Sequence, residues 1–371
     1  MLRQLRTSPG RPAHVVMTGD AVGGVWTYAL DLASGLGRAG LTTTLIVAGP
    51  RPSRDQLRSA EGVPGLTLVI TDAALDWTAM NEGELARSAA VVARIATSHR
   101  ADIVHLNSPA LAAYASFDVP VLGVCHSCAA TWWAAVKVGI PPAGVAWRIG
   151  ATAAGYAACD TLVAPSQAFA EATAAAYGAP APGVIHNGRA PRIEPPRPRE
   201  RLVLTASRLW DEGKDVQTLD RAAARIDADV VALGPLAAPD GCNVAFDRLK
   251  TPGVVASADV ASWMARAQVF ASAARYEPFG LSVLEAAQAG LPLVLSDIPT
   301  FRELWEGAAV FVPPGDADGF AAAITRLLDA PDERRSTAAA ARHRSERYGL
   351  DAMTCGYLGL IDHLRSARVP A

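Results

Sequence analysis

Two cations lie in one short segment of the chain, Ala206-Ser-Arg-Leu-Trp-Asp-Glu-Gly-Lys-Asp215. An apolar run of strand length precedes the segment and a helical pattern follows it, so Arg208 and Lys214 fall in a strand-to-helix loop. A guanidinium is a planar fork of donors and an ammonium is a point charge, and together they suit a diphosphate. The alternative is a surface loop in which Asp211 and Glu212 neutralise both cations. The chain has only three lysines, so finding one here favours a functional loop.

Two carboxylates stand eight residues apart in Tyr276-Glu-Pro-Phe-Gly-Leu-Ser-Val-Leu-Glu-Ala286. Glu277 lies in a loop stiffened by Pro278, and Gly280 is expected to open a helix that carries Glu285. Carboxylates so placed can face one cleft, where one accepts hydroxyls of a sugar and the other hydroxyls of a ribose. The free amides at the helix start suit a phosphate or sugar hydroxyls. A purely structural Glu285 is disfavoured because an unpaired buried carboxylate is costly.

A glycine-rich turn, Thr18-Gly-Asp-Ala-Val-Gly-Gly-Val25, joins a predicted strand to a predicted helix. Glycines let the backbone approach a ligand, and a helix N-terminus attracts anions. The turn is not G-x-G-x-x-G, and Leu45-Ile-Val-Ala-Gly49 offers no acid for a ribose, so a hydride-transfer enzyme is disfavoured. No Gly-Lys-Ser/Thr follows, which excludes a P-loop at this turn. A structural tight turn is the alternative.

Together, the Gly-Gly-Val turn, the Arg208/Lys214 loop and the E-P-F-G-L-x-x-L-E segment resemble the retaining GT-B glycosyltransferases of family 4 (glycosyl transferases group 1). The resemblance covers nearly the whole chain, and the pair Glu277 and Glu285 is its most specific part. It implies two Rossmann-like domains facing a cleft, with the donor in the second domain and the acceptor in the first. The implied reaction moves a hexose from a nucleotide diphosphate sugar, UDP- or GDP-linked, to a hydroxyl of a sugar or small glycoconjugate.

The resemblance also implies a role for each matched residue. The residues implied in catalysis are His126, Arg208, Lys214 and Glu277. The residues implied in donor binding are Gly23, Gly24, Arg208, Lys214, Phe279, Gly280, Leu281 and Glu285. In this scheme the two cations hold the diphosphate, Glu277 holds sugar hydroxyls, Glu285 holds ribose hydroxyls, and His126 lines the reaction centre. Retention without an obvious nucleophile implies front-face attack, with the leaving phosphate taking the acceptor's proton.

The chain departs from the family pattern at two places. Many members read R-L-x-x-x-K-G, whereas here one more residue precedes Lys214 and the order is Gly-Lys-Asp. The usual Gly-Gly after a strand-end Asp is replaced by Ile-Pro after Asp297, which leaves the roles of Arg302 and Glu303 open.

Several weaker patterns carry further expectations. Asp227-Ala-Asp229 matches the DxD that binds a cation in metal-dependent glycosyltransferases, but it precedes a strand, so we predict a surface position, no metal and no cofactor. Cys125-His-Ser-Cys128 has no second CxxC, so buried thiols are expected in preference to a zinc or redox site. The candidate acceptor contacts, with packing in the core or cleft as the alternative, are His105, Asn107, Trp132 and Trp133.

Apolar runs of strand length alternate with helical patterns along the chain, which predicts an α/β fold with two doubly wound parallel sheets. The predicted strands are 14–18, 42–48, 66–70, 103–106, 119–125, 161–164, 202–206, 230–233, 253–255, 268–271 and 292–295, and the first helix is 25–38. We predict domains at 1–190 and 191–350, and a terminal helix at 351–371 that packs toward the first domain. The proline- and arginine-rich stretch 189–201 is expected to be a solvated linker, with a phosphate-binding arm as the alternative.

Composition narrows the function classes further. The 371 residues carry a net charge of −2, and this balance disfavours nucleic acid as a partner. Without a signal peptide, a long apolar run or a basic patch, the chain is expected to be cytoplasmic, and membrane contact is not supported. The alternatives left open are a sugar-nucleotide epimerase and a non-catalytic sugar-nucleotide-binding subunit. A pyridoxal phosphorylase is disfavoured because lysines are so few.

Overall fold

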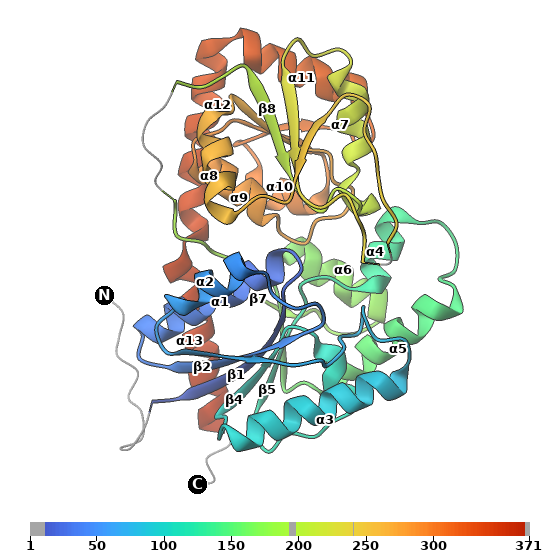
Figure 1. Ribbon diagram of the computed structural model, residues 1–371, viewed down its shortest axis with the longest axis vertical. Coiled ribbons are helices and arrows are strands. Elements are labelled where there is room, and N and C mark those ends of the chain that lie inside the picture. The colour runs from blue at the N-terminus through green and yellow to red at the C-terminus, as the bar shows by residue number, and fades with distance from the viewer. Residues whose placement is uncertain (1–11, 193–197, 240, 368–371) are drawn as a thin grey trace. The chain divides into compact units, whose positions relative to one another are not determined.

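The computed structural model describes residues 12–192, 198–239 and 241–367. The chain divides into two compact units, which are coloured along the chain in Figure 1. Unit 1 contains Met1–Gly188 and Leu350–Ala371, and unit 2 contains Arg189–Gly349. These limits fall within two residues of the predicted domain boundaries and place the terminal helix in unit 1. Residues 1–11, the middle of the predicted linker at 193–197, and the end of the predicted tail at 368–371 lie outside the described residues.

Unit 1 is built on a parallel sheet that is doubly wound. Within the described residues its seven strands have the order β3-β2-β1-β4-β5-β6-β7, and every neighbouring pair is parallel. The strands are β1 His14–Asp20, β2 Thr42–Ala48, β3 Leu66–Ile70, β4 Ile103–Leu106, β5 Val121–Val124, β6 Thr161–Ala164 and β7 Gly183–Val184. The order reverses between β1 and β4, and at such a reversal the loops leaving the two strands diverge to open a crevice.

Helices cover both faces of this sheet (Figure 1). They are α1 Gly24–Arg38, α2 Arg54–Glu61, α3 Glu82–Ser98, α4 Ala129–Val136, α5 Ala143–Ala158, α6 Gln167–Tyr177 and α13 Leu350–Ala367, with a 3-10 turn η1 at Pro109–Ala113. One core joins the sheet to α1 and α13, and the other joins it to α3, α5 and η1. The terminal helix therefore supplies part of the unit 1 core.

Unit 2 repeats the same design. Within its described residues six parallel strands have the order β10-β9-β8-β11-β12-β13. They are β8 Leu202–Ala206, β9 Asp229–Leu233, β10 Lys250–Gly253, β11 Val269–Ser272, β12 Leu293–Ser296 and β13 Val310–Val312. The reversal of strand order here lies between β8 and β11.

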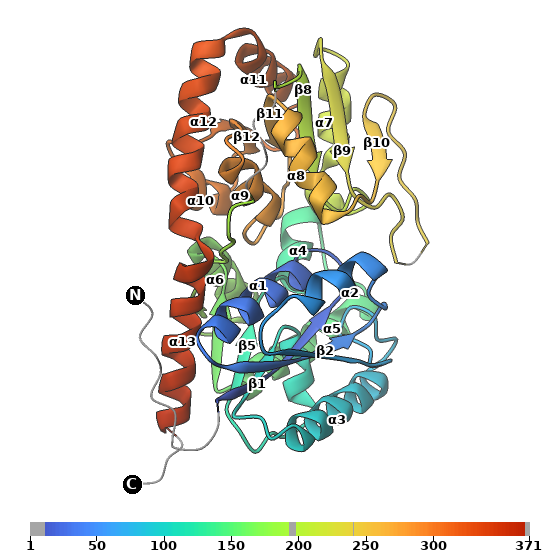
Figure 2. The same cartoon turned by 60° about the vertical axis from the view of Figure 1, so that its left-hand side comes forward.

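The helices of unit 2 are divided between two cores. They are α7 Val216–Ala223, α8 Ser257–Arg266, α9 Leu281–Gln288, α10 Pro299–Trp305, α11 Ala317–Asp329 and α12 Pro331–Ser345, with 3-10 turns η2 Glu212–Lys214 and η3 Glu346–Tyr348. One core packs α9, α10 and part of α8 against the sheet, and the other packs α7 and α11 against it (Figure 2).

Two predictions about local structure were wrong. The strand predicted at 253–255 lies at Lys250–Gly253 instead, because β10 is an edge strand and an edge tolerates Pro252. The prediction of a solvated linker was wrong for Arg189, because this residue is buried, with 7% of its surface exposed. A phosphate-binding arm is not supported at Arg199 either, since its guanidinium donates to the carbonyls of Met264, Ala267, Ala289 and Gly290.

Among the described helices, none combines the length and the apolar character that crossing a membrane requires.

Candidate active site

The two predicted motifs of unit 2 meet at the point where its strand order reverses. The Arg208/Lys214 loop leaves β8, and the loop that carries Glu277 leaves β11, its neighbour in the sheet. The two loops are joined by hydrogen bonds, since the amides of Arg275 and Tyr276 both donate to the carbonyl of Gly213, at 2.9 and 3.1 Å. A doubly wound sheet binds its ligand at this reversal, beyond the carboxyl ends of the strands.

Lys214 and Glu277 form an ion pair across these loops. Lys214 Nζ donates to Glu277 Oε2 at 2.7 Å, and the two side chains are only 12% and 16% exposed. In a partly desolvated site, removing either partner would leave the other charge unpaired, which is costly. The surface-loop alternative, in which Glu212 neutralises this lysine, is therefore not what the structure has. A residue 63 positions away neutralises it instead.

Arg208 is held by the aspartate three residues later. Its guanidinium donates to Asp211 Oδ2 at 2.7 Å and lies over the ring of Trp210 at 5.5 Å. Asp211 is 5% exposed, and its other oxygen accepts from the amide of Gly213 at 2.9 Å. One buried carboxylate thus orients the arginine and closes the η2 turn that presents Lys214. Sequence reasoning gave Asp211 only a neutralising role.

The start of α9 offers backbone donors next to Glu277. Gly280 precedes the helix with φ +91°, a left-handed conformation, and the helix start has no side-chain cap. Phe279 is 2% exposed and packs edge-on against Tyr348 at 5.6 Å, which anchors the loop. Leu281, the first helical residue, is half-buried. Uncapped amides at a helix start are ready hydrogen-bond donors to an anion or a hydroxyl.

Glu285 also has a cationic partner. It forms an ion pair with Arg189, and the two side chains are 24% and 9% exposed. The argument against a purely structural Glu285 assumed that its buried carboxylate is unpaired, and the ion pair with Arg189 removes that assumption. The predicted role in ribose binding stays a prediction. Sequence reasoning placed Arg189 at the start of a linker, and only the arginine-rich composition of that stretch could have drawn attention to it.

In unit 1 the glycine turn lies at the corresponding strand reversal. Gly23 has φ +80° and precedes α1, Gly24 is its first residue, and both are exposed. Asp20 tightens the turn by accepting from the amide of Val22 at 2.7 Å. The turn thus presents exposed backbone at a helix N-terminus, as the donor-binding prediction requires.

His126 follows β5 and is held by side chains from neighbouring strands and from α1. Its Nε2 lies 2.8 Å from Asn107 Oδ1, and its ring packs edge-on against Tyr28 at 4.4 Å. Burial and the neighbouring His105 lower the pKa of His126 to about 3. The pKa of His105, which is 1% exposed, is lowered by burial to about 4. Both rings are therefore neutral at pH 7.

The four candidate acceptor residues lie in different environments. His105 is fully buried, and Asn107 donates through Nδ2 to the carbonyl of Thr18 at 2.6 Å. Trp132 and Trp133 are half-buried on α4, and Trp133 Nε1 donates to Gly139 O at 2.8 Å. The acceptor role stays a prediction for all four, and His105 has no exposed surface through which to act.

The weaker motifs lie away from these loops or are held in ion pairs. Asp229 begins β9, at the amino end of the sheet, and pairs with Lys250 at 2.6 Å. Asp297 and Arg302 form a two-pronged pair, with both distances 2.6 Å. Cys125 and Cys128 are buried free thiols, and burial raises the pKa of Cys125 to about 12.

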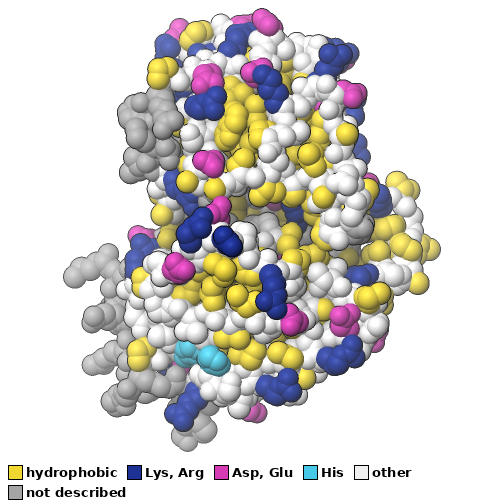
Figure 3. Space-filling model, in the orientation of Figure 1, with side chains coloured by type: hydrophobic (Ala, Val, Ile, Leu, Met, Phe, Trp, Pro, Cys, Tyr) yellow, Lys and Arg dark blue, Asp and Glu magenta, His cyan; other side chains and the backbone are white. Residues whose placement is uncertain are grey.

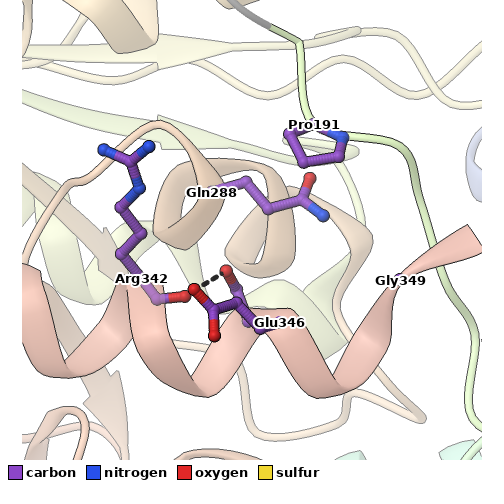
Figure 4. Close-up of a pocket in the computed structure, with 6 residues that line it drawn as sticks. Pro191, Gln288, Arg342, Glu346 and Gly349 are labelled. Atoms are coloured by element: carbon purple, nitrogen blue, oxygen red, sulfur yellow. Dashed lines mark hydrogen bonds between the residues drawn. The ribbon is translucent and has the colours of Figure 1, made fainter.

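Unit 2 also contains a cavity of about 310 Å³ (Figure 4). Gln288, at the last turn of α9, lines it, whereas the loops described above meet the first turn. Figure 4 shows the Gln288 amide turned toward Pro191 and the Arg342 guanidinium extended away from Glu346. On the face drawn in Figure 3, Lys and Arg side chains are spread out with Asp and Glu among them.

Two family models match the chain, one to each half. Residues 22–192 match the model described as Glycosyltransferase Family 4, and residues 200–330 match the model described as Glycosyl transferases group 1. Together they span most of both units.

The named relatives of the chain are consistent with these two family matches. The chain is 28% identical to a D-inositol 3-phosphate glycosyltransferase of Xylanimonas cellulosilytica, over 92% of this chain and 91% of that protein. It is 43% identical over 81 residues to a glycogen synthase of Mycobacterium tuberculosis, a match that spans 21% of this chain and only 20% of that protein.

Among solved structures, a sucrose-phosphate synthase of Thermosynechococcus elongatus has a TM-score of 0.76 at 20% identity, covering 96% of this chain and 100% of that one. Anabaena HepE in complex with UDP and glucose has a TM-score of 0.71 at 18% identity, covering 95% and 100%. The predicted fold of two Rossmann-like units is confirmed.

Proposed function

The chain belongs to family 4 of the glycosyltransferases, and on that premise we propose that it moves a hexose from a nucleotide diphosphate sugar to an acceptor hydroxyl with retention. The donor is UDP- or GDP-linked, and the acceptor is a sugar or a small glycoconjugate. The proposed donor class is supported by a structural neighbour, HepE, whose structure was solved in complex with UDP and glucose.

The observation that carries the proposal is the Lys214–Glu277 ion pair at the strand reversal of unit 2. A diphosphate needs cations, and a sugar needs hydrogen-bond acceptors for its hydroxyls. Here one cation and one carboxylate are held 2.7 Å apart, with Arg208 on the same loop as the lysine. A donor that bridges the pair satisfies both charges at once.

The proposed step follows from the charges that develop. The bond between the anomeric carbon and the diphosphate oxygen breaks, and its electron pair leaves with the diphosphate. The acceptor oxygen bonds to the same face of that carbon, and its proton passes to the departing phosphate. Arg208, Lys214 and the amides at the start of α9 stabilise the negative charge as it forms, and each such contact is typically worth about 10²–10³ in rate.

Nucleotide binding and a Glu277 variant test the proposal. UDP or GDP should raise the melting temperature, and failure of UDP, GDP and ADP alike contradicts the donor site. Glu277→Ala should abolish transfer yet leave nucleotide binding largely intact. Glu212→Ala is the matched control, because this carboxylate lies on the adjoining loop but is exposed.

The remaining alternatives differ in what they require. An epimerase converts the nucleotide sugar with no acceptor present, and a non-catalytic binding subunit converts nothing. We propose that no metal takes part, so transfer should survive EDTA unchanged. Loss of activity in EDTA would indicate that a metal takes part, with Asp227 and Asp229 as its candidate ligands.

A further inference from the structure

One side-chain amide lies between two histidines of unit 1, the buried His105 and the half-buried His126. Asn107 follows β4, and its Oδ1 lies 3.2 Å from His105 Nε2 and 2.8 Å from His126 Nε2. Its Nδ2 lies 2.6 Å from the carbonyl oxygen of Thr18, on β1. Asn107 thus connects β1, β4 and the segment after β5 at the strand reversal of unit 1.

The orientation of this amide follows from what each neighbour can do. The carbonyl of Thr18 can only accept, so the atom that faces it must be the NH₂ group. Oδ1 must then face the imidazoles, and an amide oxygen can only accept. The backbone amide of Asn107 donates to Thr18 Oγ1 at 3.0 Å, which fixes the same stretch of chain a second time. Nε2 of His126 therefore has to carry the hydrogen in this contact.

The other groups that face His126 supply no competing charge. Tyr28 from α1 contacts the ring edge-on, and His105 from β4 is the titratable neighbour that affects its pKa. Tyr357 from α13 packs on Tyr28 and His105, with centroids 6.1 and 5.5 Å apart. The low pKa of His126 keeps the ring neutral at pH 7, with one N–H only. Within residues 12–192, 198–239 and 241–367, Nδ1 of His126 takes part in no hydrogen bond.

We propose that Asn107 is a positioning residue, which holds His126 in its Nε2–H form so that Nδ1 accepts a hydrogen bond from a substrate hydroxyl. The identity of that hydroxyl rests on the proposed function. The tautomer itself does not, because it follows from the contacts of Asn107 alone. This role differs from the direct acceptor contact that the sequence predicts for Asn107, which stays a prediction.

The tautomer can be read without activity. The full chain is labelled with ¹⁵N-histidine, and His126→Gln identifies the His126 ring signals. In the wild type without substrate, Nδ1 should have the shift of a bare ring nitrogen and Nε2 that of a protonated one. A protonated Nδ1 overturns the inference.

Variants of Asn107 test whether the amide is the cause. In Asn107→Leu both ring shifts of His126 should move toward the average of exchanging tautomers. Thr18→Val is the matched control, since it disturbs the same strand end but leaves the Asn107 side chain in place, and the shifts should stay. Unchanged shifts in folded Asn107→Leu overturn the inference. Asn107→Asp places a carboxylate beside the ring and should move the titration of His126 to higher pH. If the titration does not move, Asn107 does not contact the ring.

Kinetics connects the tautomer to turnover. Asn107→Leu should lower kcat by about 10- to 100-fold, the usual loss when a partner that orients an imidazole is removed. The Kd for nucleotide should stay unchanged, because the donor cations lie in unit 2. An equal loss of kcat in Thr18→Val indicates a merely structural role and overturns the proposal. A wild type that has the expected tautomer but transfers no sugar contradicts the proposed function alone.

Discussion

Ion-paired cations are the residues on which the proposed donor site depends. Lys214 is 12% exposed and paired with Glu277, while Lys250 is 62% exposed and paired with Asp229 at the opposite end of the sheet. The two lysines thus have the same kind of partner in different places. Comparing variants of these two lysines therefore distinguishes the effect of damaging the candidate site from the effect of losing an ion pair in general.

We expect Lys214→Ala to lower transfer by about 10²–10³, because the developing charge on the diphosphate loses one donor. Nucleotide binding should weaken as well, since Glu277 is left without its cation. Lys250→Ala, an exposed pair, should change neither activity nor stability by more than about 1 kcal/mol. Steady-state kinetics and nucleotide titrations measure both effects, and equal losses in the two variants would remove Lys214 from the site.

Two histidines with lowered pKa values make the stability of unit 1 depend on pH. Burial lowers the pKa of His105 from 6.5 to about 4 and contributes most to lowering that of His126 to about 3. The unfolded chain therefore binds more protons than the folded one below pH 6.5. The free energy of unfolding should have its highest value above pH 6.5 and should fall as the pH drops toward 4.

For the fully buried His105 this loss amounts to roughly 3 kcal/mol by pH 4. Urea titrations between pH 4 and 7.5 measure the slope. His105→Gln should flatten that slope even if it lowers stability at every pH. An unchanged slope in this variant would show that another group carries the pH dependence.

At the scale of elements, strands with continuous apolar runs were predictable and short edge strands were not. Runs such as Thr42–Ala48 are buried on both faces, so composition alone marks them. The unpredicted strands, β7 and β13, contain two and three residues, too few for any pattern. β10 carries Lys250 and Pro252, which its edge position tolerates but no strand propensity favours.

The candidate site was predictable where one motif holds its own residues together, and not where tertiary contacts do. The spacing of Glu277 and Gly280 is local, and the structure has the loop-to-helix boundary that it predicts. The partners Arg189 and Asn107 come from distant segments of their units, and local sequence does not indicate such pairings. Local sequence therefore predicts which chemical groups the site contains, whereas the tertiary fold determines which of these groups are paired with a charge or held in one orientation.

The start of α9 offers a test at this scale. A Cβ at Gly280 would lie 3.3 Å from side-chain atoms of Phe301 and Val283 and 3.4 Å from Glu277 Cγ. Gly307 has a similar left-handed φ of +73°, but nothing lies within 4 Å of its Cβ position. Gly280→Ala and Gly307→Ala should each cost about 1–2 kcal/mol in backbone strain.

Only Gly280→Ala should also impair the site, because the added methyl displaces Glu277 and the helix amides. We expect transfer to fall by at least about tenfold in this variant, with the Gly307 variant close to wild type. Thermal unfolding and kinetics on both variants separate the two effects. Equal activity would show that the turn at Gly280 does not position the site.

At the scale of the whole molecule, the two units differ in how their chain is distributed. Every buried residue of both unit 2 cores lies between Leu202 and Tyr348. The ends of unit 2 are adjacent, since Arg189 N donates to Tyr348 O at 3.1 Å and Arg189 bridges to Gly349. Unit 1 instead draws on both ends of the chain, with core side chains on α13 at Leu350, Met353, Tyr357, Leu358, Ile361 and Leu364.

Unit 2 should therefore fold alone, whereas residues 1–188 without α13 should not. Each apolar side chain lost from the α13 interface removes about 1.5–3 kcal/mol of burial. The six together contribute about 9–18 kcal/mol, as much as the roughly 5–15 kcal/mol by which most domains are stable in total. A 189–349 fragment should unfold cooperatively and should gain thermal stability from the same nucleotide as the full chain. It should transfer no sugar, because His126 and Asn107 are absent. Nucleotide binding by the full chain but not by the folded fragment would show that unit 1 supplies an essential part of the donor site.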